Sequence, residues 1–416
     1  MKVLVVGRGG REHAIVKKLS QDTRITEVFA APGNDGMVEA TLVQIDETNV
    51  VKLAEFVASE KIDLTVVGPE SALMAGIVDE FQTRGLKVFG PNKKAAMIEG
   101  SKAFAKQIMS KYNIPTAVYG EFTDVEEAVA YLKAQKMPIV IKADGLAAGK
   151  GVVICQTLEE AVATVTEMMV DRSFGDASSK VVIEEFLDGE EFSLMSFVSG
   201  EIYKPMRIAR DYKRAYDNDE GLNTGGMGAH SPHPKITDAD YETALRTVVE
   251  PTVKALIAEG IPFTGILYAG LIQTPEGPKV IEFNARFGDP ETEVILPLLE
   301  TELADVMLGL LDEKDVELQW SDDATVGVVL ASDGYPTAYE NGAVITGLEE
   351  LQGVDTYHMG TKLVEGKYTT NGGRVLFVVA RAANLTDARA KIDNEIEKIK
   401  CDNLFYRKDI AKAFCD

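Results

Sequence analysis

The first 100 residues alternate between short apolar segments and amphipathic segments, and no other feature of the chain limits its fold as strongly. The apolar segments predict strands at 2–6, 27–31, 63–67 and 88–89, and the amphipathic segments predict helices at 12–19, 50–59 and 72–84. Strands that alternate with helices in this way form a parallel, doubly wound sheet. Ligands bind such a sheet beyond the carboxyl ends of its strands, where this chain has turn residues at 7–10, 32–35, 68–70 and 90–92.

The first of these turns, Gly7-Arg-Gly-Gly10, lies where a dinucleotide-binding loop would lie. The G-x-G-x-x-G fingerprint requires a third glycine, and Glu12 occupies that position. The second strand ends in Ala31 rather than in an acid that binds a ribose. Both departures argue against an NAD-dependent oxidoreductase. The N–H groups of a helix N-terminus, together with Arg11, suit a single phosphate, and a tight turn without a ligand is the alternative.

The rest of the chain is predicted to form α+β units. A helix at 101–112 precedes a small module at 113–188, in which S/T-x-x-E patterns at Thr123 and Thr157 predict capped helices. The strands of this module are predicted at 139–143, 151–154 and 180–184. Strands at 326–331 and 374–380 and a helix at 385–399 indicate a further unit. The predicted domains are 1–100, 101–325 with the module 113–188 inserted, and 326–416.

The segment Val280–Glu293 carries the strongest chemical pattern. It begins as a strand, so Glu282, Asn284 and Arg286 are predicted to share one face. Carboxylate and amide oxygens suit Mg²⁺, which binds one or two carboxylates together with substrate phosphates. Arginine suits phosphate or carboxylate oxygens. A solvated strand face would show the same alternation, but the acids of Gly288-Asp-Pro-Glu291 favour a ligand site.

The segment Lys142–Gly151 resembles a P-loop only loosely, because Gly145 and Gly149 are too close and Gly151 replaces Ser or Thr. It also joins two predicted strands. We interpret it as a mobile Gly-rich hairpin that covers phosphates, with Lys142 reaching in from the preceding strand; a flexible hairpin without a ligand is the alternative.

Two other segments are candidates for ligand contacts. The extended segment 182–191 can pair with an adenine edge while a later acid binds ribose hydroxyls, although acidic clusters are usually solvated. Asp211–Arg214 and Asn223–Gly228 lie in a Gly/Asp-rich stretch with little predicted regular structure. Long loops of this kind in compact domains are usually functional.

The charge of the chain excludes several classes of protein. Its 66 acidic and 43 basic residues give a net charge of −23, so we expect no binding to nucleic acid or to anionic membranes. Three cysteines without zinc or disulfide spacing, and the lack of a signal-peptide pattern, predict a cytoplasmic protein. No apolar run reaches the roughly 18 residues of a membrane helix. Because the chain is strongly acidic, any phosphate site must be a local cationic pocket.

Together these segments resemble the ATP-grasp superfamily and, within it, the phosphoribosylamine–glycine ligase family. The resemblance runs essentially end to end, and its most specific parts are 223–228 and 282–291. Other matching segments are 7–13, 32–34, 68–70, 142–151, 184–191, 211–214, 371–374 and 406–410. The resemblance implies an α/β N-terminal phosphosugar domain, an ATP-grasp core with a mobile Gly-rich lid, and a small C-terminal α+β domain.

The resemblance also implies an activity, which is the ATP-dependent ligation of glycine to 5-phosphoribosylamine in de novo purine biosynthesis. The products would be glycinamide ribonucleotide, ADP and phosphate, formed through a glycyl phosphate. The alternatives are another ATP-grasp carboxylate–amine ligase of purine metabolism and a nucleotide-binding regulatory protein without catalysis. A monomer is expected, with these small molecules as its partners.

The family motifs assign roles to matching residues. The implied ATP-binding residues are Lys102, Lys142, Gly149, Gly151, Glu184, Phe186, Leu187 and Glu191. The implied ligands of Mg²⁺, or of Mn²⁺ in its place, are Glu282 and Asn284, and the implied catalytic residues are Arg286, Lys142 and Asp289. The implied substrate-binding residues are Gly9, Gly10, Arg11, Glu70, Asp211, Lys213, Gly225, Gly226 and Asp289.

Two departures from the family pattern stand out. Many ATP-grasp enzymes carry a metal-binding acid about a dozen residues before the E-x-N pair, where this chain has Ala269–Gln273. The metal shell is therefore expected to depend on Glu282, Asn284, phosphates and water. Tyr212 and Glu293 also replace the His and Gln of the family motifs.

Overall fold

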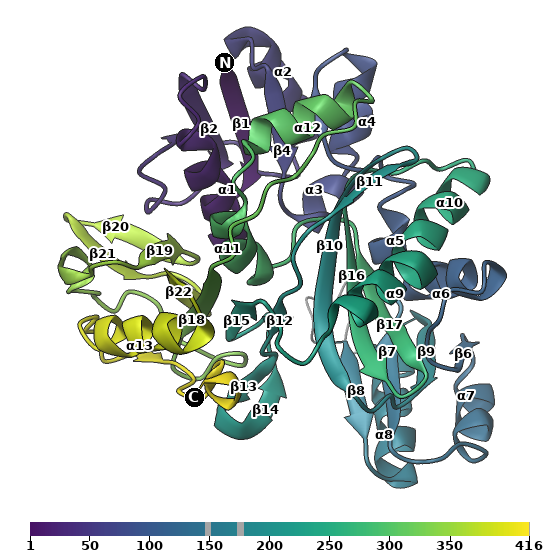
Figure 1. The fold of residues 1–416 in the computed structure, drawn as a ribbon. Coiled ribbons are helices and arrows are strands. Elements are labelled where there is room, and N and C mark those ends of the chain that lie inside the picture. The colour runs from purple at the N-terminus through teal and green to yellow at the C-terminus, as the bar shows by residue number, and fades with distance from the viewer. Residues whose placement is uncertain (146–150, 173–178, 416) are drawn as a thin grey trace.

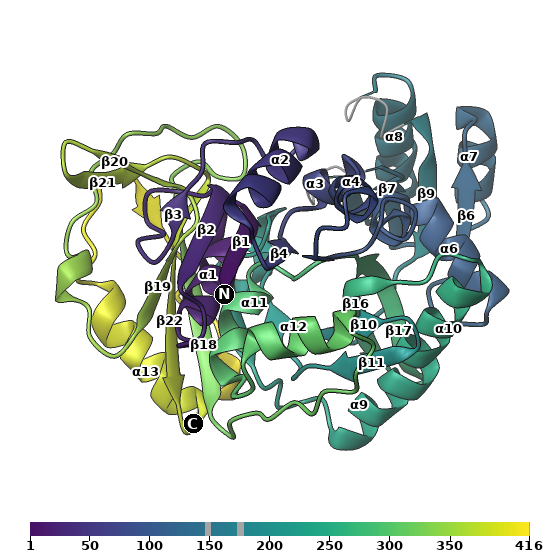
Figure 2. The ribbon, with the colours of Figure 1, turned by 90° about the horizontal axis from the view of Figure 1, so that it is seen from above.

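A computed structural model describes residues 1–145, 151–172 and 179–415. Figure 1 shows the N-terminal sheet at the top, an antiparallel core sheet with a lid module at the right, and the C-terminal sheet at the lower left. Viewed from above in Figure 2, the C-terminal sheet and the lid module lie on opposite sides of the molecule. The predicted α/β and α+β multidomain architecture is confirmed.

The N-terminal sheet is parallel throughout, as predicted, with strand order β3-β2-β1-β4-β5. Its strands are β1 (Lys2–Gly7), β2 (Glu27–Pro32), β3 (Thr41–Leu42), β4 (Leu64–Val67) and β5 (Val88–Phe89). Its helices are α1 (Gly10–Ser20), α2 (Val50–Glu60), α3 (Glu70–Met74) and α4 (Ile77–Thr83). The single helix predicted at 72–84 is wrong, because Gly76 has a φ of +86° and separates α3 from α4.

Both faces of this sheet are buried, as a parallel sheet requires. Val3 and Val5 pack on one side with Ile15 of α1 and with Leu303 of α12 (Leu303–Leu311). Leu4 and the α2 and α4 side chains pack on the other side. In Figure 1, α12 crosses the sheet although it lies some 200 residues further along the chain. The N-terminal domain and the core are therefore packed into shared hydrophobic clusters.

The core sheet is antiparallel, with order β11-β10-β16-β17. Its strands are β10 (Glu190–Ser199), β11 (Ile202–Pro205), β16 (Thr264–Thr274) and β17 (Gly277–Asn284), flanked by α6 (Lys102–Lys111), α9 (Asp238–Ala244) and α10 (Glu250–Ala258). Between β16 and β17, Gly270 pairs with Glu282 while Leu271 pairs with Val280. Ile281 is thus the extra residue of a β-bulge, which bends a strand locally and redirects its side chains.

The lid module is a four-stranded antiparallel sheet with order β6-β9-β7-β8. Its elements are β6 (Tyr119–Phe122), α7 (Val125–Leu132), β7 (Ile139–Ala143), β8 (Val152–Cys155), α8 (Leu158–Met169) and β9 (Val181–Glu185). The capping box predicted at Thr157 is confirmed, since its hydroxyl accepts the N–H of Glu160. The box predicted at Thr123 is wrong. Asp124 is the N-cap there, because its carboxylate accepts the N–H groups of Glu126 and Glu127.

The C-terminal sheet has the order β12-β15-β18-β22-β19, with β23 also pairing with β18. Its elements are β12 (Arg210–Asp211), β15 (Gly228–Ser231), β18 (Ala324–Ser332), β19 (Asp355–His358), β22 (Arg374–Ala382), α13 (Leu385–Ile396) and β23 (Leu404–Phe405). The helix α13 packs on this sheet through Ala388, Ile392 and Ile396. On the same helix Ala390 is exposed, whereas Arg389 is buried.

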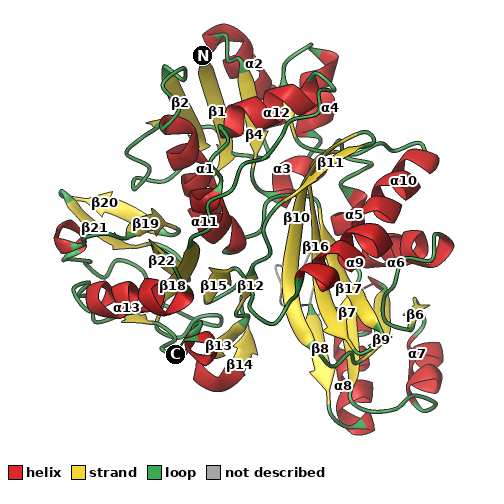
Figure 3. Ribbon diagram, viewed as in Figure 1, coloured by secondary structure: helices red, strands yellow, loops and turns green. Residues whose placement is uncertain are grey.

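The Gly/Asp-rich stretch at 210–231 has more regular structure than predicted. Besides β12 and β15, it contains a hairpin of β13 (Arg214–Tyr216) and β14 (Glu220–Asn223), as Figure 3 shows. These strands are too short to produce a period-2 pattern, and the second partner of β15, which is β18, lies far along the chain. The stretch joins the core to the C-terminal sheet, because β15 pairs with β18 over residues 228–231.

Candidate active site

The strand β17 presents polar side chains on one face, as predicted. Phe283 and Ala285 are 4% and 1% exposed, whereas Glu282, Asn284 and Arg286 are partly exposed. The Asn284 Oδ1 atom accepts a hydrogen bond from Arg286 Nη2 at 3.3 Å. Glu282 and Asn284 are hard oxygen donors that fit Mg²⁺. Among the described residues, no group of three or more His, Cys, Asp or Glu side chains is placed to hold a metal, so phosphates and water would have to complete the shell.

Arg286 is held by carboxylates from the N-terminal part of the chain. Its Nη2 atom lies 2.9 Å from Glu99 Oε1, on the short helix α5 (Met97–Gly100), and its Nε atom lies 3.3 Å from Glu70 Oε2. Burial lowers the pKa of Arg286, but Glu99 and Glu70 outweigh it and hold the pKa above its usual value. Arg286 is therefore a permanent cation beside the predicted metal ligands, and Glu70 is one of its carboxylate partners.

Glu99 is a functional residue that the sequence analysis missed. Its Oε2 atom accepts the backbone N–H of Ala285 at 2.8 Å, so one carboxylate fixes both the Arg286 guanidinium and the chain after β17. Burial raises the pKa of Glu99, because the charged form loses its hydration. A single glutamate in a four-residue helix gives no sequence signal of such a contact.

The turn after β1 contains an internal carboxylate. Glu12 Oε2 accepts the N–H of Gly9 at 2.7 Å, and Glu12 Oε1 accepts the Nε–H of Arg11. A side chain at Gly68 would come within 2.0 Å of the same carboxylate. Arg11 is buried and also donates to the Phe287 carbonyl at 3.2 Å. Glu12 thus fills the turn, in agreement with the argument against a dinucleotide fingerprint.

The predicted phosphate-binding lysines lie between the lid and the core. Lys142 of β7 donates to the Ile281 carbonyl at 2.9 Å and pairs with Glu184 Oε1 at 2.9 Å. The carbonyl of the bulge residue is therefore used to hold this lysine. Lys102 donates to the Gly145 carbonyl at 3.4 Å, and burial lowers the pKa of its ammonium.

The other predicted nucleotide residues are distributed around the same region. Phe186 is 40% exposed, directly after β9, and Leu187 is half-buried. Gly151 is buried, and its carbonyl accepts the N–H of Ala143 at 2.8 Å. Gly149 lies outside the described residues, as do the other residues of the stretch 146–150 in the predicted hairpin.

A lysine joins the predicted ribose-binding acid to the substrate residues. Lys213 Nζ lies 2.8 Å from Glu191 Oε2 of β10 and 3.9 Å from Asp211 Oδ1 of β12. Burial raises the pKa of Asp211 to about 7, with further repulsion from Glu291 and Glu191, while Lys213 opposes the shift. Asp211 is thus a carboxyl that can change protonation near neutral pH.

Asp289 is held by a residue of the C-terminal sheet. Arg374 Nη1, on β22, lies 2.7 Å from Asp289 Oδ1 and donates to the Gly225 carbonyl at 2.7 Å. Gly226 has a φ of +109°, and a side chain there would come within 2.4 Å of the Pro290 ring. The structure therefore brings Gly225, Gly226 and Asp289 together around Arg374, which the sequence analysis placed in a matching segment without a role.

Three family models match almost the whole chain. They describe the N domain of phosphoribosylglycinamide synthetase at residues 1–99, its ATP-grasp (A) domain at 100–292 and its C domain at 325–413. The chain belongs to the phosphoribosylglycinamide synthetase family. It is therefore an ATP-grasp ligase, for which ATP is the expected nucleotide.

Curated relatives named phosphoribosylamine–glycine ligase support this assignment. The relative from Halalkalibacterium halodurans is 55% identical over 420 residues, covering 100% of this chain and 98% of its own. The relative from Listeria monocytogenes serovar 1/2a is 53% identical, covering 99% of both chains. The crystal structure of the Thermotoga maritima phosphoribosylamine–glycine ligase matches with a TM-score of 0.88 at 34% identity, covering 99% of this chain and 100% of that one.

A more distant structure shares the fold alone. The biotin carboxylase domain of the 2-oxoglutarate carboxylase from Hydrogenobacter thermophilus, in complex with MgADP, has a TM-score of 0.74 at 17% identity, covering 97% of this chain and 91% of that one.

Among the described residues of this synthetase-family chain, no helix is long and apolar enough to cross a membrane.

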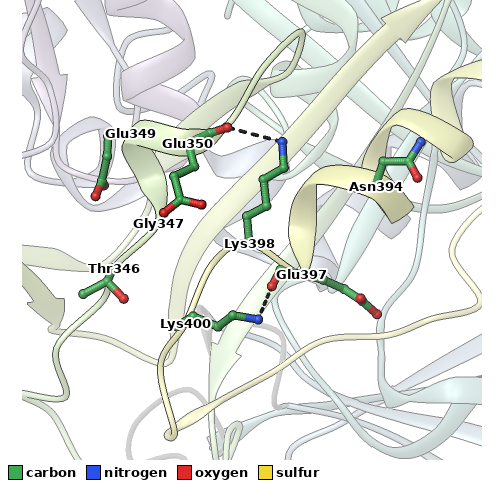
Figure 4. Close-up of a pocket in the computed structure, with 8 residues that line it drawn as sticks. All are labelled: Thr346, Gly347, Glu349, Glu350, Asn394, Glu397, Lys398 and Lys400. Atoms are coloured by element: carbon green, nitrogen blue, oxygen red, sulfur yellow. Dashed lines mark hydrogen bonds between the residues drawn. The ribbon is translucent and has the colours of Figure 1, made fainter.

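A surface pocket of about 480 Å³ in this member of the synthetase family lies apart from the candidate site. Its lining residues belong to the C-terminal part of the chain, as Figure 4 shows, and none is a predicted site residue: Thr346, Gly347, Glu349, Glu350, Asn394, Glu397, Lys398 and Lys400. Its lysines already donate to the Glu350 and Glu397 carbonyls, so they are occupied within the pocket wall.

Proposed function

We propose that this chain ligates glycine to 5-phosphoribosylamine in two steps through a glycyl phosphate. A glycine carboxylate oxygen attacks the γ-phosphorus of ATP, and ADP leaves. The amine of 5-phosphoribosylamine then attacks the acyl carbon and expels phosphate, which yields glycinamide ribonucleotide. The first step is needed because a carboxylate oxygen is a poor leaving group, whereas phosphate is a good one.

The position of Arg286 is the observation that carries this proposal. It lies between Asn284 of the metal-binding pair and two glutamates of the N-terminal part, at distances of 2.9–3.3 Å. A fixed cation at this point can stabilise the transferring phosphoryl group and then the acyl phosphate. The same residue links the nucleotide side of the site to the sheet predicted to bind the phosphosugar.

The nucleotide side is assigned to the region where the lid meets the core. Lys102 and Lys142 contact the ATP phosphates. The backbone at the end of β9 and directly after it holds adenine, and Glu191 binds the ribose. Glu282 and Asn284 hold Mg²⁺, or Mn²⁺ in its place, and the bound ion neutralises phosphate charge and acts as a Lewis acid. The Lys142–Ile281 contact supports this assignment, because it places an ammonium next to the metal-binding strand.

The substrate side is assigned to the residues around the N-terminal turns and Arg374. Gly9, Gly10, Arg11 and Glu70 face the phosphoribosylamine, while Asp211, Lys213, Gly225, Gly226 and Asp289 line the glycine and amine positions. The contacts of Arg374 with Asp289 and Gly225 support the second group. Because Glu12 already binds the Gly9 N–H and Arg11, a phosphate at this turn would have to displace or share those contacts.

The domain organisation is proposed as 1–100 for the phosphosugar domain, 101–325 for the ATP-grasp domain with the lid at 113–188, and 326–416 for the C-terminal domain. We further infer a cytoplasmic monomer that does not bind nucleic acid. The net charge of −23 supports the last inference, because nucleic-acid binding requires clustered positive charge.

The test is ADP release with Mg-ATP, glycine and freshly generated 5-phosphoribosylamine, omitting each substrate in turn. We expect turnover that requires both glycine and the sugar amine. With glycine and ATP alone, hydroxylamine should trap the intermediate as glycyl hydroxamate. ADP release with another carboxylate or amine would favour a different ATP-grasp ligase. A lack of hydroxamate, with normal turnover, would contradict the glycyl phosphate.

A further inference from the structure

A buried cluster of three charged side chains lies behind the proposed phosphate-binding lysine. Lys106 Nζ of α6 lies 3.0 Å from Glu184 Oε2, and Lys142 Nζ lies 2.9 Å from Glu184 Oε1. Their side chains are only 3–4% exposed. Each oxygen of the carboxylate therefore binds a different ammonium, and the cluster has two positive charges and one negative charge.

This cluster joins four structural elements. Lys106 also donates to the Thr116 hydroxyl at 2.7 Å, and Thr116 donates to the Val280 carbonyl of β17 at 2.7 Å. Lys142 donates to the neighbouring Ile281 carbonyl. Strands β7 and β9 of the lid are thus connected to α6 and to the metal-binding strand through one hydrogen-bonded network.

The charge balance of the cluster has a consequence for Lys142. A buried ion pair of Lys142 with Glu184 alone would be neutral, and Glu184 would cancel most of the attraction that Lys142 exerts on a phosphate. With Lys106 on its second oxygen, Glu184 is shared between two ammonium groups. One unit of positive charge is then left uncompensated within the cluster, next to the region where the phosphates are proposed to bind.

We propose that Lys106 is a positioning residue of the nucleotide site, which neutralises Glu184 so that Lys142 keeps its positive charge for the phosphates of ATP. This inference rests on the proposed role of Lys142 in ATP binding. Lys106 itself does not contact the nucleotide; it acts through Glu184. The structural requirement is for the charge of Lys106, not only for its hydrogen bond to Thr116.

The protonation state of Lys106 gives a second argument that its charge supports nucleotide binding. Burial lowers the pKa of Lys106 to about 8, although Glu184 opposes the shift, and Lys142 lowers it further. The charged and titratable groups that face Lys106 are Glu184 and Glu185 of β9, Lys142 of β7, and Tyr119 of β6, whose ring lies 5.4 Å from the ammonium. Above pH 8, neutral Lys106 should therefore weaken nucleotide binding.

The experiment measures the Kd for MgADP by calorimetry at pH 7 in the full chain, so neither glycine nor the sugar amine is needed. We expect Lys106→Met to weaken binding by about tenfold, which corresponds to about 1.4 kcal/mol. The double variant Lys106→Met/Glu184→Gln should bind about threefold or more tightly than Lys106→Met, because it also removes the carboxylate that Lys106 neutralises. The double variant lacks one positive and one negative charge of the cluster. Lys142 then remains as its single cation. Lys111→Met is the control, because Lys111 lies on the same helix with its side chain 63% exposed and should not affect binding.

A purely structural role of Lys106 would give a different result, because the double variant would then bind at least as weakly as Lys106→Met. That outcome, or unchanged binding by Lys106→Met, would overturn the proposal. A wild type that does not bind MgADP would instead contradict the ATP-dependent function itself.

A charge-retaining variant keeps the proposal testable if Lys106→Met fails to fold. Arginine stays protonated throughout the accessible pH range. We therefore expect the Kd of the wild type to rise between pH 7.5 and pH 9.5, and the Kd of Lys106→Arg to rise less over the same range. Parallel pH profiles of the two proteins would overturn the proposal.

Discussion

Glu99 Oε1 lies 2.9 Å from Arg286 Nη2, and the other oxygen of the same carboxylate accepts the N–H of Ala285 at 2.8 Å. One side chain from the N-terminal part thus fixes a cation and the backbone directly after Glu282 and Asn284, the proposed metal ligands. The contact of Glu99 with Nη2 and that of Glu70 with Nε together restrict the position and the orientation of the guanidinium.

Glu99→Gln is expected to lower kcat by about 10- to 100-fold, a range typical of a displaced transition-state contact. A glutamine accepts only one of the two donors, so Arg286 or the Ala285 backbone loses its partner. The KM for ATP should change by less than about threefold, because the proposed nucleotide contacts lie elsewhere. Steady-state kinetics measures both values. Glu60→Gln, at a surface pair with Lys2, is the control, and an unchanged kcat for Glu99→Gln would contradict the assigned role.

Arg374→Lys is expected to lower kcat/KM for glycine and for the sugar amine by about tenfold, without changing the Kd for MgADP. Lysine cannot maintain the contacts that Arg374 makes with Asp289 and with the Gly225 carbonyl. Arg381→Lys is a matched control on the same strand, since Arg381 binds Asp323 at the surface. Weaker MgADP binding by Arg374→Lys would show that the residue serves the nucleotide side instead.

Glu293→Gln is expected to stabilise the protein increasingly as the pH rises. Glu293 is fully buried, neither carboxylate oxygen has a hydrogen-bond partner among the described residues, and burial with nearby Asp289 raises its pKa well above the usual value. A raised folded pKa contributes stability that is complete below the unfolded pKa and is lost as pH rises through the folded pKa. Between these pKa values, the wild type should lose about 1.4 kcal/mol per pH unit relative to Glu293→Gln.

Thermal unfolding from pH 5 to pH 8 measures this difference. The Tm of Glu293→Gln should approach that of the wild type at pH 5 and exceed it at pH 8. Glu317→Gln is the control, because Glu317 is exposed and its replacement should give a difference that does not depend on pH. A constant difference for Glu293→Gln would mean that Glu293 is ionised throughout.

Chelation of divalent ions is expected to abolish ADP release, and added Mg²⁺ should restore it. In Glu282→Gln, the Mg²⁺ concentration for half-maximal activity should rise by about tenfold or more, because a neutral amide replaces the one carboxylate of the proposed pair. Glu276→Gln, in the turn before β17 with its side chain 76% exposed, is the control. An unchanged Mg²⁺ requirement in Glu282→Gln would contradict its assignment as a ligand.

The sequence predicted features that depend on local spacing. Two such features are the parallel N-terminal sheet and the shared face of Glu282, Asn284 and Arg286. Both follow from the period with which side chains return to the same face of a strand or a helix. The contacts of Glu99, Lys106 and Arg374 were not predicted, because each partner lies tens to hundreds of residues away. The bulge at Ile281 was also missed, since a single extra residue in one strand is defined by the register of its partner.

The pairing of β15 with β18 means that the boundary at residue 325 separates two halves of one sheet. A fragment that begins at residue 326 would retain residues 326–332 of β18, together with β19, β22 and β23. It would expose one edge of β18, and an uncovered edge strand is a site of aggregation. A fragment that ends at 325 would carry β12 and β15 without their sheet. The C-terminal part is therefore not a cassette that recombination can exchange on its own, and β15 would have to move with it.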